Sequence, residues 1–316
     1  VDDYLRMLEL VLDKASRRVG REFCRSTLWP DKRGFAVALT HDVDWIQKFT
    51  TRYFLSLPVR PHKLWRDWGQ IQQYLGGEKD PYDTIKDIVA LEKTYQSTST
   101  FFFLAARRHP FDGQLLSANY PPITPYIADL CEWIESEGWE VGLHGSYLSM
   151  DRLAYLREER EDLGEVAQVR GVRQHYLRID VERGLRIMEA IGLQYDTSLG
   201  FNDRLGFRAG FSFPYHPYCV AEDRPYSVLE IPLAVMDATL DSEGSCYEEA
   251  LERSLAALEV VRISGGCCAI LWHNSIFDTV QYPRYGKVYE DILRWIVEYG
   301  GWGTACCSIF ACYDGE

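Results

Sequence analysis

The sequence lacks several features that mark particular classes of protein. No apolar run approaches the roughly 20 residues that a membrane-spanning helix needs, so we expect no transmembrane segment. No Gly-x-Gly-x-x-Gly or Walker-type loop follows the first predicted strand, which argues against a nucleotide-binding fold. Basic residues are also few: 34 Lys and Arg stand against 47 Asp and Glu, with a formal net charge of −13. This balance argues against general binding of nucleic acids, which needs a basic face.

The number and the spacing of the cysteines argue against a disulfide framework. There are nine of them, an odd number, and no Cys-x-x-Cys pair occurs. Cys267-Cys268 lies in an apolar run typical of a strand, which favours buried free thiols in a reducing compartment. We therefore expect a cytoplasmic location. No signal peptide is visible, but a chain that begins at Val1 instead of Met can be part of a longer one, so this carries little weight.

The length and the composition of successive segments suggest a division of the chain. The 316 residues suffice for one large α/β domain or two ordinary ones. Residues 3–20 carry apolar side chains at helical spacing. Residues 1–34 are therefore expected to form a helical extension or a linker, followed by the main domain over 35–316. An insertion at about 45–82 is rich in aromatic and basic residues. It is either a lid that holds a sugar or an anionic group, or an arm that packs in a groove between helices.

Strands and helices alternate about seven times from residue 35 onward. Buried strands are predicted at about residues 35–42, 99–104, 139–143, 171–176, 195–200, 228–233, 267–272 and 302–304. Ser245 and Glu248 have the spacing of a capping box for a helix that ends at Gly265-Gly266, and the last helix is expected around 288–296. The alternation predicts a parallel sheet closed into a deformed (β/α)7-type barrel. An open doubly wound sheet is the alternative.

Polar side chains stand at the ends of the predicted strands. Asp42 and Asp44 end the first strand and point to the same side, because side chains alternate along a strand. Two carboxylates so close repel each other unless a proton or a cation lies between them, so a metal ligand beside a base is the sharpest interpretation. Solvated residues in a polar loop are the alternative. Further strand ends carry His144, Arg173, His175, Asp196 and His273. In a barrel, all of these lie on the face where active sites are built.

These segments resemble the motifs of polysaccharide deacetylases with a NodB-type homology domain, which are carbohydrate esterases that remove N-acetyl groups. Thr40-His41-Asp42-Val43-Asp44 is similar to the first motif of that family, and Glu140-Val141-Gly142-Leu143-His144-Gly145-Ser146 to the second. Arg173 begins a segment similar to the third, and Leu271-Trp272-His273 is similar to the fifth. The resemblance covers roughly residues 35–312.

The resemblance implies a role for each catalytic candidate. Asp42 would be the catalytic base, and Arg173 would brace it. His273 would be the general acid that protonates the leaving amine. Asp196 falls where the family often has an Asp that orients this His.

The resemblance also implies a metal site, from which this chain departs at one position. Asp44 and His144 would be ligands, and Zn²⁺ is the expected metal, with Co²⁺, Ni²⁺ or Mn²⁺ as alternatives. The family's second motif carries another His four residues after the first, where this chain has Leu148. The third motif normally has Pro where this chain has Gln174-His175-Tyr176. Our hypothesis is that His175 replaces the missing ligand.

The function implied by the resemblance is the metal-dependent removal of N-acetyl groups from a saccharide or glycoconjugate. An N-acetylated carbohydrate would be the partner, contacted by Tyr176, whose backbone N–H is a candidate donor to the oxyanion, and by Arg208. Arg208 lies in a segment, 195–210, that is either a lid over an anionic or sugar substrate or a loop closing the barrel mouth. Two other functions remain open. One is a non-catalytic saccharide-binding domain, motivated by Leu148, and the other is an amide hydrolase for a non-sugar substrate.

Overall fold

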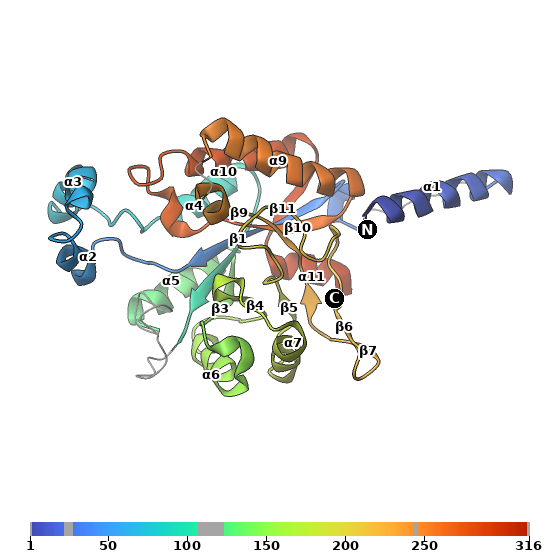
Figure 1. Ribbon diagram of the computed structural model, residues 1–316, viewed down its shortest axis with the longest axis horizontal. Coiled ribbons are helices and arrows are strands. Elements are labelled where there is room, and N and C mark those ends of the chain that lie inside the picture. Colours follow the sequence, from blue (N-terminus) through green and yellow to red (C-terminus); the bar gives the residue numbers. More distant parts are fainter. Residues whose placement is uncertain (1, 22–27, 107–122, 243–244, 315–316) are drawn as a thin grey trace.

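A curled parallel sheet forms the centre of the molecule. The computed structural model describes residues 2–21, 28–106, 123–242 and 245–314 (Figure 1). In these residues nine strands form one sheet, in the order β8-β5-β4-β3-β2-β1-β10-β9, with β11 pairing beside the start of β1. The strands are β1 (Ala36–Val43), β2 (Thr100–Leu104), β3 (Glu140–Gly145), β4 (Gly171–Gln174), β5 (Tyr195–Asp196), β8 (Leu229–Glu230), β9 (Leu233–Met236), β10 (Cys267–Leu271) and β11 (Trp302–Thr304). The deformed barrel predicted from the sequence is confirmed.

Helices between the strands cover the outer face of this sheet (Figure 1). The helices are α1 (Asp2–Arg18), α2 (Thr51–Ser56), α3 (Pro61–Leu75), α4 (Ile85–Thr94), α5 (Pro125–Ser136), α6 (Leu153–Gly164), α7 (Val181–Ala190), α8 (Asp237–Ser242), α9 (Tyr247–Ser264), α10 (Tyr285–Glu298) and α11 (Cys306–Asp314). A short antiparallel ribbon, β6 (Tyr218–Cys219) with β7 (Arg224–Pro225), lies outside the sheet. Among the described residues, no helix has the length and apolar character that crossing a bilayer requires.

Strand β1 shows how the alternation of side chains separates the core from the site. Val37 and Leu39 face the outer helices, whereas Ala36 and Ala38 lie in the cluster inside the barrel, where space is limited. The alternation continues at the end of the strand. His41 therefore faces outward and bonds through its two ring nitrogens to the carbonyl oxygen of Trp272 and to Glu92 of α4. His41 is thus a structural residue within the first motif.

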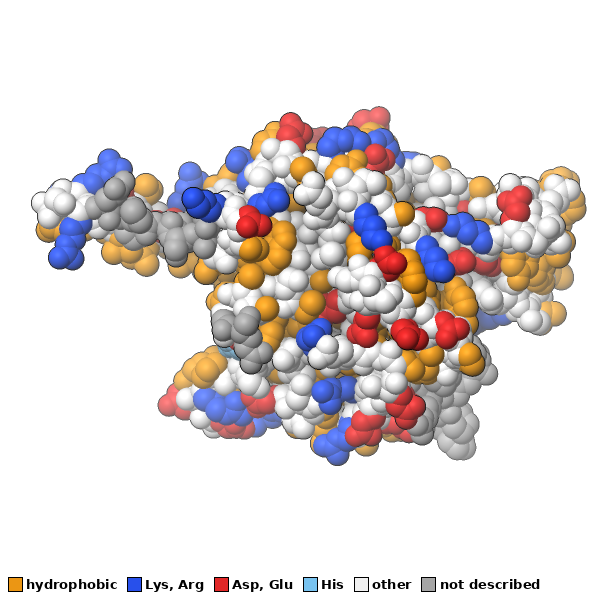
Figure 2. All heavy atoms as spheres, turned by 180° about the vertical axis from the view of Figure 1, so that it is seen from behind, with side chains coloured by type: hydrophobic (Ala, Val, Ile, Leu, Met, Phe, Trp, Pro, Cys, Tyr) orange, Lys and Arg blue, Asp and Glu red, His pale blue; other side chains and the backbone are white. Residues whose placement is uncertain are grey.

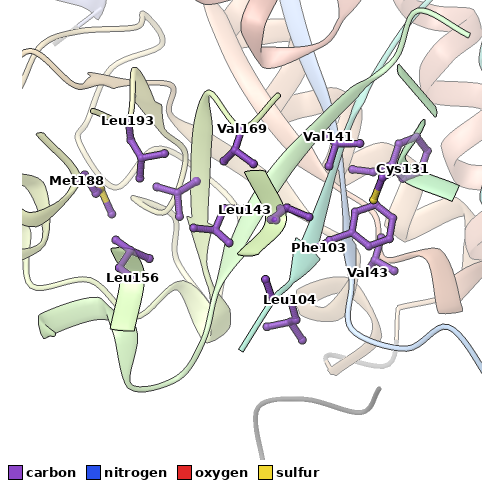
Figure 3. Close-up of a cluster of buried hydrophobic side chains, with 14 of the residues drawn as sticks. Val43, Phe103, Leu104, Cys131, Val141, Leu143, Leu156, Val169, Met188 and Leu193 are labelled. Atoms are coloured by element: carbon purple, nitrogen blue, oxygen red, sulfur yellow. The ribbon is translucent and has the colours of Figure 1, made fainter. Parts of the chain in front are cut away.

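The largest hydrophobic cluster packs the outer face of β1–β4 against α4–α7 (Figure 3). Val43, Phe103, Val141 and Leu143 supply the strand side of this cluster, and each is fully buried. The helix side includes Cys131 of α5, Leu156 of α6 and Met188 of α7. This packing holds the ends of β1, β3 and β4 at fixed positions relative to one another.

Two expectations about the C-terminal third were wrong. The capping box at Ser245 and Glu248 does not form, because α9 begins after Cys246, and the Ser245 hydroxyl instead accepts a hydrogen bond from Arg253. The end of that helix is confirmed, with Gly265 in the left-handed conformation at φ 66°. The helix predicted around 288–296 is not the last one. Helix α11 follows β11 and packs Cys306 and Ile309 into the cluster inside the barrel.

Helix α1 projects from the body of the molecule (Figure 1, right). None of its side chains is buried, and Asp2 accepts hydrogen bonds from the backbone N–H of Ser212. On the face shown in Figure 2, hydrophobic side chains are exposed along this helix (left) and at the opposite end of the molecule. The helix expected near the N-terminus is therefore present, while residues 22–27 of the predicted extension lie outside the described residues.

The insertion at 45–82 forms an arm at the other end of the molecule (Figure 1, left). Its helices α2 and α3 share a small core, in which Phe49, Tyr53 and Ile71 are buried. A buried ionic cluster attaches this arm to the body. Nζ of Lys48 lies 3.0 Å from Asp67 of α3 and 2.6 Å from Asp278, which lies in the segment between β10 and α10.

Replacing Asp67 with Asn should loosen the arm. Burial raises the pKa of Asp67, but hydrogen bonds from Arg66, Tyr53 and Lys48 outweigh it and lower the pKa to about 2. Because this pKa lies below the ordinary 3.8, the carboxylate stabilises the fold above pH 3.8, and the stabilisation is lost as the pH falls through about 2. The shift corresponds to about 2 kcal/mol. Hydrogen exchange of the α3 amides at pH 7 should therefore be faster in Asp67→Asn.

The matched control for this change is Asp87→Asn, which removes an exposed carboxylate paired with Lys79. Exposed ion pairs contribute little, so exchange in the control should match the wild type. The difference between wild type and Asp67→Asn should also shrink as the pH falls from about 4 to about 2. Equal exchange rates of the arm at pH 7 would contradict a stabilising role for this cluster.

Candidate metal centre and active site

The polar residues at the ends of β1, β3, β4 and β10 meet at one mouth of the barrel. Asp42 lies within β1, and Asp44 follows directly after it. His144 lies in β3, and His273 comes two residues after the end of β10. Strands β1, β3 and β4 are parallel and lie within one continuous part of the sheet, so their carboxyl ends share one edge. This is the edge where a barrel places an active site.

Asp44, His144 and His175 form a group that could hold a metal ion. Their potential ligand atoms all lie within 4.8 Å of one another. Oδ1 of Asp44 lies 3.2 Å from Nε2 of His144 and 3.4 Å from Nε2 of His175. Both imidazoles are almost fully buried, whereas the Asp44 side chain is 17% exposed. Leu148, in the turn after β3, offers no ligand atom.

A tight turn after β4 brings His175 to this place. The turn is a single 3₁₀ segment, His175–Leu177, in which Tyr176 has the left-handed backbone angle φ 58°. A non-glycine residue in this region costs on the order of 1–2 kcal/mol. The ring of Tyr176 stacks on that of His175, with ring centroids 4.1 Å apart and an interplanar angle of 19°. The strained turn and the stacked ring together fix the His175 imidazole next to Asp44.

The hydrogen bonds of His144 suit a metal ligand. Nδ1 of His144 lies 2.8 Å from the carbonyl oxygen of Arg173, and a carbonyl can only accept, so Nδ1 carries the hydrogen. The neutral ring then presents the lone pair of Nε2 toward Asp44. This Nε2 is buried and makes no hydrogen bond within the described residues. Metal-binding histidines have this arrangement, in which the second ring nitrogen is fixed by a backbone carbonyl. The residues present therefore fit a divalent cation.

The charges around the three residues favour a positive ion between them. Burial raises the pKa of Asp44, but the neighbouring imidazoles of His144 and His175 outweigh it, so its pKa lies well below the ordinary value. Burial lowers the pKa of His144, but the carboxylates of Asp42 and Asp44 outweigh it and raise the pKa. The same carboxylates that favour a proton on His144 also attract a metal cation. The proton and the cation therefore compete for this position.

Asp42 is held beside this group by a fully buried arginine. Nη1 of Arg173 lies 3.2 Å from Oδ1 of Asp42 and also donates to Oγ1 of Thr40 at 2.7 Å. The other nitrogens of the guanidinium donate to Thr197, which fixes its plane. Oδ2 of Asp42 lies 3.7 Å from Nε2 of His144. Arg173 thus contacts Asp42, the position that the resemblance implies for it.

His273 is oriented by a carboxylate that the sequence analysis missed. Nδ1 of His273 lies 2.8 Å from Oδ1 of Asp237, and its backbone N–H donates to Oδ2 of the same residue at 2.6 Å. Nε2 is left facing the site, 3.8 Å from Oδ2 of Asp44. Burial lowers the pKa of His273, but the charge and the hydrogen bond of Asp237 outweigh it and raise the pKa to about 10. The Asp237 carboxylate therefore favours the protonated form of His273.

The assignment of Asp196 as the partner of His273 was wrong, and the order of the strands explains why. Asp196 lies in β5, which is on the opposite side of β1 from β10, whereas Asp237 follows β9, the neighbour of β10. Asp196 instead accepts a hydrogen bond from Ser198 at 2.5 Å and pairs in register with Glu230 of β8. The same strand-end pattern could have found Asp237, because it directly follows the apolar segment Leu233–Met236.

The two predicted substrate contacts line one pocket beside this site. Tyr176 and Arg208 both border a pocket of about 540 Å³, together with Phe201 and Arg204. Tyr176 is about half exposed, and Arg208 is exposed. The pocket reaches the site through Tyr176, whose ring packs on His175.

Comparisons with known proteins establish the fold. No protein-family model matches the sequence, and no curated protein sequence matches it. Solved structures do match. A Mycobacterium smegmatis protein described as a polysaccharide deacetylase is 18% identical with a TM-score of 0.58, and the match covers 91% of this chain and 92% of that one. A Pseudomonas aeruginosa PAO1 protein described in the same way is 14% identical with a TM-score of 0.59, and the match covers 93% of this chain and 95% of that one.

A third solved structure, the allantoinase Puue, matches equally well. It is 14% identical with a TM-score of 0.58, and the match covers 93% of this chain and 98% of that one. The chain therefore shares one fold, over nearly its whole length, with proteins described as polysaccharide deacetylases and with an allantoinase.

Proposed function

We propose that the protein is a metal-dependent hydrolase that removes N-acetyl groups from a saccharide or glycoconjugate. The observation that carries the proposal is the arrangement around Asp44, His144 and His175. Asp42 stands on one side of this group, and the protonated His273 stands on another. A base, an acid and a three-residue ligand set with room for water are the parts that amide hydrolysis by a metal-activated water needs. The fold shared with proteins described as polysaccharide deacetylases supports the choice of substrate.

The residues of this chain divide the reaction between them. Asp44, His144 and His175 would hold the cation, which when bound lowers the pKa of a water molecule and polarises the amide carbonyl. Asp42 accepts the proton of the attacking water, and Arg173 holds the Asp42 carboxylate in place by the hydrogen bond from Nη1 to Oδ1.

The leaving nitrogen needs a proton, and His273 supplies it. Asp237 keeps His273 protonated and fixes its ring by two hydrogen bonds, one to Nδ1 and one to the backbone N–H. Nε2 then faces the same space as Asp44, where the amide would lie. Tyr176 and Arg208 border the neighbouring pocket and would contact the sugar.

An amide hydrolase for a non-sugar substrate is the second candidate. The observation that favours it is the match to the allantoinase Puue, whose TM-score equals that of one of the deacetylase-like structures. The test is to deplete the protein of metal with a chelator, reload it with Zn²⁺, Co²⁺, Ni²⁺ or Mn²⁺, and supply N-acetylated saccharides or allantoin. Acetate release from saccharides that depends on the metal supports the first candidate. Hydrolysis of allantoin alone supports the second, and a loaded protein that releases no acetate overturns the proposed function.

Replacing Asp237 with Asn should lower kcat by roughly 10²-fold or more, as in other enzymes where a carboxylate orients a catalytic histidine. The Asn side chain is neutral, so it does not stabilise the protonated form of His273. Asp237 accepts hydrogen bonds from both Nδ1 and the backbone N–H of His273, whereas Asn has a single acceptor oxygen and would lose one of them. KM and the bound metal should change little, because Asp237 does not belong to the ligand group. Steady-state kinetics together with elemental analysis would show this. A variant that loses its metal along with its activity would contradict the positioning role.

A further inference from the structure

The arm and the body of the molecule enclose a second pocket, of about 360 Å³, with a basic lining. Its twelve lining residues include Trp45, Arg52, Arg60, Lys63 and Tyr82. Five of these twelve are Lys or Arg, and none is Asp or Glu. This is unusual in a chain whose formal net charge is −13, so the basic residues are concentrated here against the general balance.

Only part of this positive charge is neutralised within the described residues. Asp67, which is buried behind the pocket, accepts hydrogen bonds from Lys48, Tyr53 and Arg66, and Asp278 takes a second bond from Lys48. Arg52, Arg60 and Lys63 form no ion pair with any described residue.

The local charge also acts on Lys63. Burial lowers the pKa of this ammonium group, and the neighbouring charges of Arg60 and Arg66 lower it further. Three cations that line one pocket and form no ion pair with a described residue repel one another, and an anion bound between them would relieve this repulsion. The pocket is thus suited to an anionic group.

The basic pocket adjoins the active site. Trp45, which lines it, directly follows Asp44 in the chain. Asn274, which directly follows His273, donates hydrogen bonds to the carbonyl oxygens of Trp45 at 2.7 Å and Tyr82 at 3.0 Å. Two residues of the pocket wall are thereby fixed to the strand end that carries the general acid. The basic pocket and the active site are thus joined through the segments Asp44-Trp45 and His273-Asn274.

We propose that this pocket binds a phosphate or diphosphate group attached to the N-acetylated sugar, and that a phosphorylated sugar is the substrate class. The inference rests on the proposed function. Arg presents planar pairs of donors that match phosphate oxygens, and charged donors make the strongest hydrogen bonds. Thr50 lies in the same lining, and its hydroxyl, which accepts a hydrogen bond from the backbone N–H of Tyr53, can still donate its own hydrogen to a phosphate oxygen. A neutral glycan would leave Arg52, Arg60 and Lys63 unpaired.

The first experiment measures binding without catalysis. Inorganic pyrophosphate is titrated calorimetrically into the full chain, kept free of metal by a chelator. The Arg60→Gln/Lys63→Gln variant should bind it about 10–100-fold more weakly, as expected when two charge-assisted contacts are lost. The control Lys14→Gln/Arg18→Gln removes the same two charges from α1, where both side chains are exposed, and should bind like the wild type. Equal affinity in the wild type and the pocket variant overturns the proposal.

The second experiment measures activity with the metal-loaded protein. The substrates are N-acetylglucosamine, its 1-phosphate, its uridine diphosphate conjugate and N-acetylmuramic acid, which carries a carboxylate instead of a phosphate. The phosphorylated sugars should have the higher kcat/KM, and the pocket variant should lose this preference through a raised KM. Equal kcat/KM for the neutral and the phosphorylated sugars, or a preference for the carboxylate, overturns the phosphate assignment while leaving the deacetylase proposal intact. Tight pyrophosphate binding that depends on Arg60 and Lys63, without any acetate release, supports the pocket and rejects the deacetylase.

Discussion

Replacing Asp42 with Asn should lower the rate of amide hydrolysis by roughly 10²–10⁴-fold, the usual contribution of a general base. Asn has the same shape and can still accept the hydrogen bond from Arg173, but it cannot take a proton from the attacking water. The cation should stay bound, because Asp42 is not one of the three grouped ligands. Steady-state kinetics and elemental analysis of the same preparation would measure both quantities.

The matched control is Asp44→Asn, two residues along the same strand end. Asp44 lies 3.2 Å from Nε2 of His144 and 3.4 Å from Nε2 of His175, so its replacement should remove the metal as well as the activity. The two aspartates are thus distinguished by what each variant retains. If Asp42→Asn lost the cation as completely as Asp44→Asn, Asp42 would be a ligand and the base would have to be another residue.

The sequence was sufficient to locate the candidate site because two simple rules apply at strand ends. Side chains alternate along a strand, so Asp42 faces inward with Ala36 and Ala38 while His41 faces the helices. Parallel strands of a barrel present their carboxyl ends on one face, so polar residues that follow apolar runs lie together. These rules bring the strand-end residues to one face without knowledge of the order of the strands. The choice of Asp44, His144 and His175 among them came from the resemblance to the deacetylase motifs, and the three do lie close together.

The partner of His273 could not be predicted because it depends on that order. Asp196 and Asp237 both follow apolar segments, and only the pairing of β9 with β10 decides that Asp237 reaches His273. The second pocket was equally inaccessible. The sequence shows many basic and aromatic residues over 45–82, but their placement depends on ionic contacts between Lys48 and residues about 20 and 230 positions away. Long-range contacts of this kind leave no local pattern.

Replacing His175 with Gln should weaken metal binding by more than the roughly 10–100-fold that is typical of changes around a metal-ligand set. Nε2 of His175 lies 3.4 Å from Oδ1 of Asp44, within the only three-residue ligand group found among the described residues. Loss of one of three protein ligands leaves Asp44 and His144, which cannot enclose a cation as well. The dissociation constant for Zn²⁺ would be measured by competition with a chelator of known affinity.

Gln is preferred to Ala because it retains much of the volume of the imidazole, on which the ring of Tyr176 stacks. His144→Ala is the positive control and should weaken Zn²⁺ binding at least as strongly. His216→Ala is the negative control, since this histidine pairs with Asp314 near the C-terminus and should leave the affinity unchanged. Wild-type affinity in His175→Gln together with a raised KM would make His175 a substrate contact. The chain would then lack a replacement for the ligand position that Leu148 vacates, and a metal-dependent mechanism would need a different third ligand.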